Sequence, residues 1–347
     1  MPAAAPRHPC GQRLIMFNNI YIEEQVAAHP RSRAICERFP QATRISCERY
    51  GEVFNPKSQD FRLQKRNPSL ILAHKHDGRL LETPEGYGIG GSNNYYFSHM
   101  LNCLYDCRYC FLQGMYRSAN YVLYVNYEDF IQDIDATLAQ ANNEPCWFFS
   151  GYDCDSLVLE PVSGFAENFL PFFAKHPSAH IELRTKSTQI RSLLKQPAIP
   201  NAVIAFSFTP AEVHTALEHK VPTIERRIEA MQKLQHAGWP VGLRFDPMIY
   251  HPDYQQQYTR LFAQLFGPLD TTCLHSVSLG PFRLPRSYFR NIVRLYPDEA
   301  LFAGTFTETA GMISYPPSLE REMTDFCTGE LLKHIPETAL FPCGLAA

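Results

Sequence analysis

The sequence predicts an α/β protein whose main part is a partial (β/α)6 barrel. The chain has 347 residues, and 45% of them are hydrophobic, which is enough apolar side chain for a large buried core. Between residues 90 and 296, short apolar segments alternate with longer segments in which apolar residues recur at helical spacing. Strands that alternate with helices pair in parallel through right-handed crossovers. We therefore expect three parts: an N-terminal α/β extension at 1–89, the barrel at 90–296, and a strand–helix closure at 297–347.

Hydrophobic spacing also predicts the individual elements. In the extension we expect strands at 20–22 and 70–73 and a helix at 24–38. Asn126 can cap the first barrel helix, Thr223 can cap a later helix that stops at Gly238, and Pro171 should bend or break the helix that contains it. The expected later strands are 121–125, 146–149, 181–184, 203–208, 241–245, 273–279 and 312–315, and the expected later helices are 254–266, 288–296 and 319–334.

Composition narrows the class of protein. The net charge is −3, so there is no global basic field, and any contact with nucleic acid must use a local patch. No apolar stretch reaches the length of about 18 residues that a membrane span needs, so we expect no membrane partner. The first 13 residues lack the apolar segment of a secretory signal. Eleven cysteines in such a chain indicate a reducing compartment, the cytoplasm, and thiols that bind metal or react.

One segment, NCLYDCRYCFLQG at 102–114, carries specific chemistry. Cys103, Cys107 and Cys110 have C-x3-C-x2-C spacing, so three thiolates can hold one face of an iron–sulfur cube. Such a cube normally takes four thiolates, and with three, one iron stays open to a small chelating ligand. The alternatives are free core cysteines or a zinc site, but zinc sites usually add a second Cys or His pair and none follows. We interpret the motif as the ligand set of a [4Fe–4S] cluster. We expect the other cysteines outside the loop at 148–160, Cys10 among them, to be packing residues.

The three-cysteine motif resembles that of the radical S-adenosylmethionine (SAM) superfamily. Its extended form, C-x3-C-x-Y-C-[YF]-L-Q, is similar to the spore photoproduct lyase family in particular. Further pieces fall in that family's order, at 20–25 and 62–73 upstream and at 206–208, 246–250 and 281–283 downstream. The resemblance covers most of the chain.

This resemblance implies a radical mechanism. SAM would bind the open iron through its amino and carboxylate groups, and one electron would cleave it to methionine and a 5′-deoxyadenosyl radical. In that family the radical abstracts a hydrogen from a thymine dimer joined through a methylene bridge. The dimer then fragments to two thymines, and a protein group returns a hydrogen atom. The implied partners are a damaged thymine step in DNA and reduced flavodoxin or ferredoxin as electron donor.

The resemblance also implies roles for residues near the last cluster cysteine and in a loop of the barrel. Tyr109 matches a proposed relay for the returning hydrogen. Phe111 stands where the relatives usually have a second tyrosine, and because Phe has no O–H, a two-tyrosine relay cannot run here. The loop at 148–160 follows the second barrel strand, where parallel barrels build their sites.

In this loop the family's hydrogen-donor cysteine falls on Tyr152, and its cofactor-contacting serine falls on Cys154. The thiol is therefore present but two residues late. We expect Cys154 to be the hydrogen donor, with a cofactor-side role or an inert buried thiol as alternatives. Tyr152 and Asp155 are expected beside the cofactor.

Three further residues match family positions: Lys186 and Ser207 end strands, and Arg283 lies just past Leu279. Lys186 and Ser207 match residues that contact the SAM carboxylate or ribose, and an ammonium and a hydroxyl suit that task. Arg283 matches an arginine near the substrate, and its guanidinium can hold a phosphate or carboxylate in a bidentate manner. The alternatives are solvated strand ends and a surface salt bridge. Arg283 also begins a cluster with Arg286, Arg290 and Arg294, which could follow a DNA backbone or be a solvated helix face.

The function predicted from the sequence is radical SAM repair of a UV thymine lesion in DNA. Two alternatives stay open. One is a radical SAM enzyme of the same family that acts on another nucleobase or a small molecule, which the changes at Phe111 and Tyr152 favour. The other is a redox or regulatory protein that holds a cluster without turning SAM over, and the presence of Lys186 and Ser207 argues against it.

Overall fold

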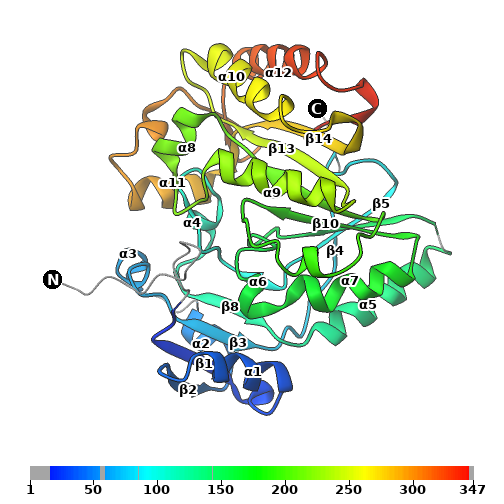
Figure 1. The fold of residues 1–347 in the computed structure, drawn as a ribbon. Coiled ribbons are helices and arrows are strands. Elements are labelled where there is room, and N and C mark those ends of the chain that lie inside the picture. The colour runs from blue at the N-terminus through cyan, green and yellow to red at the C-terminus, as the bar shows by residue number, and fades with distance from the viewer. Residues whose placement is uncertain (1–15, 55–58, 85, 143, 344–347) are drawn as a thin grey trace. The chain divides into compact units, whose positions relative to one another are not determined.

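The computed structural model describes residues 16–54, 59–84, 86–142 and 144–343 (Figure 1). Two compact units divide the chain. The first unit comprises the chain up to His74 together with Arg117–Val125, and the second comprises Lys75–Tyr116 together with the chain from Asn126 onward. Cys10 and the segment 1–13, on which predictions were made, lie outside the described residues.

The first unit contains a parallel sheet. Within the described part of this unit the strand order is β2-β1-β3-β8, and each neighbouring pair is parallel. The strands of the unit are β1 Asn19–Glu23, β2 Thr43–Cys47, β3 Leu70–Ala73 and β8 Tyr121–Tyr124. Its helices are the 3-10 turn Glu24–Val26, α1 Pro30–Arg38, α2 Gly51–Phe54 and α3 Phe61–Gln64.

Two predictions for this unit are corrected. The strand at 121–125 was expected in the barrel, but β8 pairs with β3. The sequence pattern could not show this, because a short apolar run predicts a buried strand without indicating which sheet it joins. The helix expected at 24–38 is interrupted, since Pro30 lacks an N–H and begins α1 as its first residue. His29 caps this start by accepting a hydrogen bond from the Arg31 N–H at 3.2 Å.

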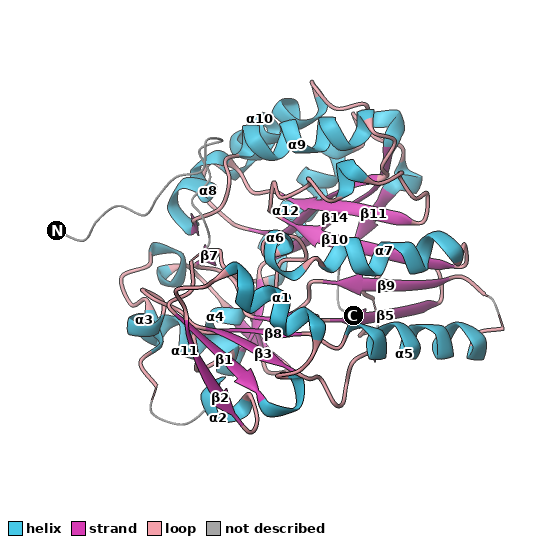
Figure 2. Cartoon of the chain, turned by 60° about the horizontal axis from the view of Figure 1, so that its bottom comes forward, coloured by secondary structure: helices cyan, strands magenta, loops and turns pink. Residues whose placement is uncertain are grey.

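The second unit contains the predicted partial barrel. Its sheet has the order β18-β14-β13-β11-β10-β9-β5-β4 among the described residues. The six neighbouring strands from β5 to β14 are all parallel, which confirms the fold class; Figure 2 labels β5, β9, β10, β11 and β14 among them. β18 adds a further parallel strand, and β4 adds an antiparallel one. The strands are β4 Leu81–Glu82, β5 Asn93–Phe97, β9 Cys146–Ser150, β10 Ala179–Thr185, β11 Ala202–Ser207, β13 Val241–Met248, β14 Leu274–Pro281 and β18 Leu340–Pro342.

The longer helices of this unit agree with the sequence patterns to within a few residues. They are α5 Tyr127–Gln140, α7 Phe165–Lys175, α9 Ile224–His236, α10 Tyr254–Phe266, α11 Arg286–Leu295 and α12 Pro317–Leu331. The shorter ones are α4 Leu112–Met115, α6 Glu160–Ser163, α8 Ala211–Leu217 and the 3-10 turns Leu193–Lys195, Thr271–Cys273, Ala300–Ala303 and Glu337–Ala339. In the described part of the chain, no helix is both long enough and apolar enough to cross a membrane.

The predicted caps have different outcomes. Thr223 caps α9 through its side chain, as expected. Asn126 occupies the N-cap position of α5, but its side-chain oxygen accepts the Lys75 N–H at 2.9 Å and so is used outside the helix. The expected break at Pro171 is wrong, because α7 runs through this residue. Pro171 lies on the exposed side of α7, while the opposite side is held by buried rings such as Phe169.

Short strands complete the second unit. β6 Met100–Leu101 and β7 Asp106–Cys107 lie in the loop that contains the cysteine motif, and β12 Glu218–His219 follows α8. β15 Arg283–Pro285, β16 Thr307–Thr309 and β17 Met312–Ser314 form a small antiparallel sheet in the order β15-β17-β16.

The barrel strands also carry a buried ion pair. Glu182 on β10 and Arg244 on β13 are both almost fully buried, with 2.6 Å between Arg244 Nη2 and Glu182 Oε2. The same guanidinium donates to the Ser276 hydroxyl on β14 at 2.9 Å. One arginine therefore joins β14, β13 and β10 across the intervening β11, below the ends where the site lies.

We expect Gly114→Ala to destabilise the fold. Gly114 lies in α4 where α11 approaches closely: a Cβ there would collide with the backbone carbonyl of Tyr288 and come within 2.9 Å of Ile292 Cγ1. Overpacking of this kind typically costs about 1–3 kcal/mol. Gly329→Ala in α12 is the matched control, because a Cβ meets nothing within 4 Å there. The control should be neutral or stabilising by up to about 1 kcal/mol. Urea unfolding of both variants checks this, and a Gly114→Ala variant as stable as the control would contradict the close approach.

Candidate active site

The three motif cysteines lie on a loop that follows β5, the first strand of the parallel set. The middle of the loop is held in place by a segment far along the chain. β7 pairs with β12 so that Cys107 lies opposite Glu218, and the Arg108 N–H donates to the Leu217 carbonyl at 2.9 Å. The Cys110 N–H donates to the Cys107 carbonyl at 3.1 Å and forms a turn between the last two cysteines.

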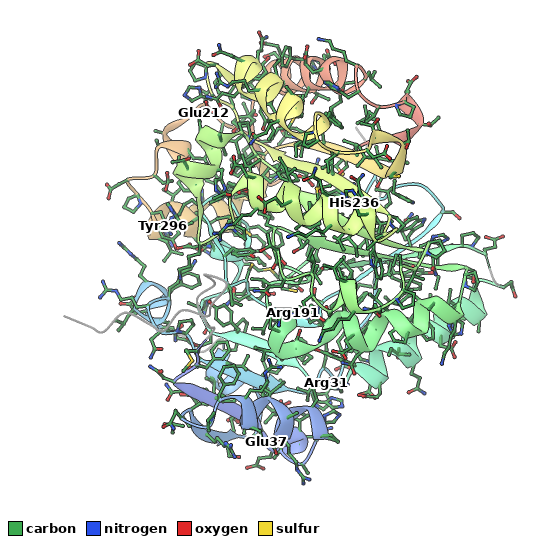
Figure 3. All side chains as sticks on the ribbon, viewed as in Figure 1. Arg31, Glu37, Arg191, Glu212, His236 and Tyr296 are labelled. Atoms are coloured by element: carbon green, nitrogen blue, oxygen red, sulfur yellow. The ribbon has the colours of Figure 1, made fainter. Side chains whose placement is uncertain are left out.

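The outer side of the loop is held by polar contacts. Asp106 accepts hydrogen bonds from Arg108 at 3.1 Å and from the Gln113 amide at 3.2 Å. The Arg108 guanidinium lies 3.9 Å from the centre of the Tyr296 ring, and Tyr296 is marked in Figure 3. The Tyr296 hydroxyl donates to the Gln113 amide oxygen at 3.1 Å. These contacts hold the loop in place from its outer side.

The donor set fits an iron–sulfur cluster. Burial raises the pKa of Cys107, and burial together with the nearby Asp155 carboxylate and the other two motif thiols raises that of Cys103. The three sulfurs are therefore close enough for their charges to interact, and because burial opposes their deprotonation, a bound cation would favour the thiolate forms. Among the described residues, no three or more His, Cys, Asp and Glu side chains are arranged to hold one metal ion. In a four-iron cube each cysteine binds a different iron, so its ligands stand further apart than those of one ion.

A buried carboxylate, Glu218, lies behind this loop. The Tyr109 hydroxyl donates to its Oε1, and Lys186 Nζ lies 3.9 Å from the same oxygen. Its Oε2 lies 3.2 Å from Arg227 Nη2 and 2.9 Å from His214 Nδ1. One carboxylate thus organises two cations, an imidazole and a phenol beside the cluster loop.

Electrostatics explains why these groups are charged although they are buried. Burial alone would raise the pKa of Glu218, but Lys186 and Arg227 outweigh it and lower that pKa. Burial would lower the pKa of Lys186, but Glu218 and Cys107 outweigh it and raise that pKa. Burial and the Glu218 charge raise the pKa of Tyr109 well above its usual value. Tyr109 is thus a neutral phenol that keeps its proton and donates a hydrogen bond to the Glu218 carboxylate.

The loop after β9 is held by Asp155. Its Oδ1 accepts the N–H groups of Leu157 and Val158 at 3.0 and 2.9 Å and the Thr185 hydroxyl at 2.6 Å. Its Oδ2 accepts the Lys186 N–H at 2.6 Å. Asp155, expected beside the cofactor, therefore ties the loop to the end of β10 and positions the backbone of Lys186.

Gly151 begins this loop with a φ of +85°, a conformation that L side chains rarely adopt, and a Cβ there would meet Ser156 Oγ at 2.5 Å. Cys154 and Tyr152 then point to different environments. Cys154 is buried, and its thiol, which accepts the Met100 N–H, has a pKa raised well above the usual value by burial. Tyr152 is 47% exposed.

Ser207 lies at the end of a strand, as expected, and Arg283 lies just past the end of β14. Ser207 is the last residue of β11 and is buried, and its carbonyl accepts the Arg227 Nη1–H at 2.7 Å. Arg283 begins β15, is half-buried and donates from Nη2 to the Tyr87 hydroxyl at 2.7 Å. In the basic cluster, Arg286 is paired with Glu308 at 2.9 Å.

Sequence reasoning missed Glu218 and Arg227. The only local signal is the spacing of His214 and Glu218, four residues apart at the end of α8, which is also common on solvated helices. What distinguishes Glu218 is its complete burial, and that follows from its pairing with β7.

A partial barrel of six parallel strands, with three clustered cysteines after the first strand and polar side chains at the strand ends, defines the radical SAM class of protein. A family model described as spore photoproduct lyase matches residues 89–301. This match covers more than half of the chain, and the chain therefore belongs to the spore photoproduct lyase family.

Named relatives agree with this assignment. The spore photoproduct lyase of Bacillus subtilis is 24% identical over 81% of this chain and 83% of its own length. That of Clostridium acetobutylicum is 22% identical over 82% of this chain and 84% of its own length. A solved spore photoproduct lyase variant with bound AdoMet and dinucleoside spore photoproduct has the same fold, with a TM-score of 0.84 at 17% identity over 96% of this chain and 99% of that one.

Proposed function

We propose that this chain is a radical SAM lyase that repairs a methylene-linked thymine dimer of the spore photoproduct type in DNA. The observation that carries the proposal is the cysteine loop, which follows the first strand of the barrel and is held by the pairing of β7 with β12, in a chain of this family. Curated relatives are named spore photoproduct lyase, and a solved relative holds AdoMet and a dinucleoside spore photoproduct.

The residues divide the work as follows. Cys103, Cys107 and Cys110 would hold a [4Fe–4S] cluster, which together with SAM supplies a 5′-deoxyadenosyl radical when bound. Lys186 presents an ammonium for the SAM carboxylate, and Glu218 fixes its position. Ser207 offers a hydroxyl to the polar edge of the cofactor, and Arg283 offers a guanidinium to the substrate.

The cell compartment and the electron donor are part of the same proposal. The free thiols of the described residues suit the reducing cytoplasm, where reduced flavodoxin or ferredoxin would supply the electron. The division of the chain at residues 89 and 296 stays a prediction. So does the relay role of Tyr109, whose hydroxyl is held on Glu218.

Anaerobic reconstitution tests the function directly. The holoprotein, with SAM and dithionite, is incubated with UV-irradiated spore-type DNA and with undamaged DNA, and products are identified by mass spectrometry. Conversion of the lesion to two intact thymine residues in the DNA, with formation of 5′-deoxyadenosine, supports the proposal. SAM cleavage that the lesion does not stimulate would point to another nucleobase or a small molecule. Absence of 5′-deoxyadenosine with every donor would favour the non-catalytic alternative.

We expect Cys154→Ala to separate SAM cleavage from clean repair. The thiol has a weak S–H bond and is the one thiol that the described loop at 151–156 contains, so we propose it as the hydrogen donor. Because Cys154 is buried, this role requires the loop to move when substrate binds. The variant should still form 5′-deoxyadenosine but give reduced or trapped thymine products. Clean repair at the wild-type rate would eliminate Cys154 as donor. Cys146→Ala, another buried thiol, is the matched control.

A further inference from the structure

Three aromatic rings from separate segments meet beside the last motif cysteine. Tyr152, from the loop after β9, lies with its ring centre 4.7 Å from that of Tyr96 on β5. On its other side the ring centre of Phe111, the residue after Cys110, lies 5.3 Å away. We call Tyr96, Phe111 and Tyr152 the aromatic triad.

The triad leaves a ring surface open. Both neighbours meet Tyr152 at a tilt, 44° for Tyr96 and 45° for Phe111, so neither covers its ring flat. Among the Phe, Tyr and Trp side chains that the structure describes, only Tyr152 at 47% and Tyr250 at 38% are exposed. Leaving a large aromatic face in water forgoes the stabilisation that its burial would give. An exposed ring next to the reaction centre therefore suits a planar ligand.

A guanidinium is held close to the triad. Burial raises the pKa of Tyr152, and the nearby Tyr96, Asp153 and Tyr87 add to this shift, so Tyr87 lies near the Tyr152 phenol. Tyr87 in turn binds Arg283 through its hydroxyl at 2.7 Å. The Arg283 guanidinium also lies 5.1 Å from the Tyr87 ring centre. Within the described chain, one Arg283 nitrogen has a hydrogen-bond acceptor, which leaves the remaining N–H groups for a ligand.

We propose that the aromatic triad is a stacking platform for a nucleobase of the substrate, with Tyr152 as the stacking residue and Arg283 as the anchor for the adjoining phosphate or base carbonyl. The inference rests on the proposed function and adds a part of the substrate site to it. Aromatic faces beside a fixed guanidinium match a nucleotide, which is a planar base joined to an anion. Tyr152, expected from the sequence to lie beside the cofactor, is thereby assigned to the substrate. Phe111 supports the stack and needs no hydroxyl.

Binding without turnover tests this inference. Isothermal titration calorimetry of the reconstituted protein, without reductant, compares a dinucleotide that carries the spore photoproduct with an abasic dinucleotide of the same backbone. Tyr152→Ala should weaken binding of the base-carrying dinucleotide by about 5- to 150-fold and leave the abasic one unchanged. Tyr152→Phe should bind as the wild type does, because it keeps the ring. Tyr250→Ala removes the other exposed tyrosine, which packs on Tyr254 and Tyr315, and is the matched control.

Each outcome decides the inference. Equal loss of binding in Tyr152→Phe and Tyr152→Ala would mean that the hydroxyl acts and not the ring, and would overturn it. Wild-type affinity in Tyr152→Ala, or a wild-type protein that binds both dinucleotides equally, would overturn it as well. Iron content and thermal unfolding of each variant show that the protein is intact. Base-dependent binding through Tyr152 without repair of the lesion would keep the stacking platform and reject the proposed reaction, so the two failures are distinguishable.

Discussion

Replacing Cys103, Cys107 or Cys110 by alanine, one at a time, is expected to leave the reconstituted protein without a stable four-iron cluster and without SAM cleavage. The loop offers three thiols, and each would bind a different iron, so no thiol can substitute for a missing one. A cluster with two protein ligands also has two open irons in place of one. Iron and sulfide content, the visible absorption spectrum and 5′-deoxyadenosine formation measure the effect, which should approach complete loss.

Two further cysteines are the controls for this experiment. Cys154→Ala removes a buried thiol of the neighbouring loop, and Cys273→Ala removes an exposed thiol next to β14. Both variants should keep the iron content of the wild type. Loss of the cluster in Cys154→Ala would show that the ligand set is not the one proposed. Full iron content in Cys107→Ala would show the same.

Glu218→Gln is expected to destabilise the folded protein by about 3–5 kcal/mol. The amide keeps the shape of the side chain but removes its charge, and it leaves Lys186 and Arg227 without their buried counterion. The side chains of Glu218 and Arg227 are both completely buried, so water cannot replace the lost partner. Urea unfolding at neutral pH measures the change as a lower midpoint with an unchanged slope.

Glu212→Gln is the matched control, and Glu212 is marked in Figure 3. Glu212 lies on α8, close in sequence to Glu218, and forms an ion pair with Arg260. Both partners are about half exposed, so the pair contributes at most about 1 kcal/mol. If the two variants unfold at the same urea concentration, the buried network does not stabilise the protein in the way proposed.

Acid unfolding gives a second measure of the same network. Because the folded state lowers the pKa of Glu218, its contribution is fully present above the ordinary carboxyl pKa of about 4.3 and is lost as the pH falls below it. Wild-type stability should therefore fall more steeply below that pH than the stability of Glu218→Gln. If the stabilities of the two proteins fall equally steeply with decreasing pH, this would contradict the lowered pKa of Glu218.

The sequence by itself determined the fold class and predicted the cysteine ligand set. Helical and strand periodicities are local properties, so the alternating pattern predicted the parallel barrel and placed most helices to within a few residues. The three cysteines lie within eight residues, so their spacing alone limits the chemistry that they can share. Single proline and asparagine residues were less reliable for predicting helix breaks and helix caps. Pro171 sits on the exposed side of its helix, and the Asn126 side-chain oxygen accepts a hydrogen bond from outside its helix, because packing and neighbouring segments override local preference.

The tertiary structure alone decided which distant residues act together. Tyr109 and Glu218 are 109 residues apart and share a hydrogen bond, because β7 pairs with β12. The same kind of pairing put β8 beside β3 instead of in the barrel. The fold also gives two residues that are close in sequence different environments: Cys154 is buried, whereas Tyr152 is exposed and packs beside Phe111. The spacing of residues along the chain does not predict such contacts, because they arise from strand pairing and burial across the whole fold.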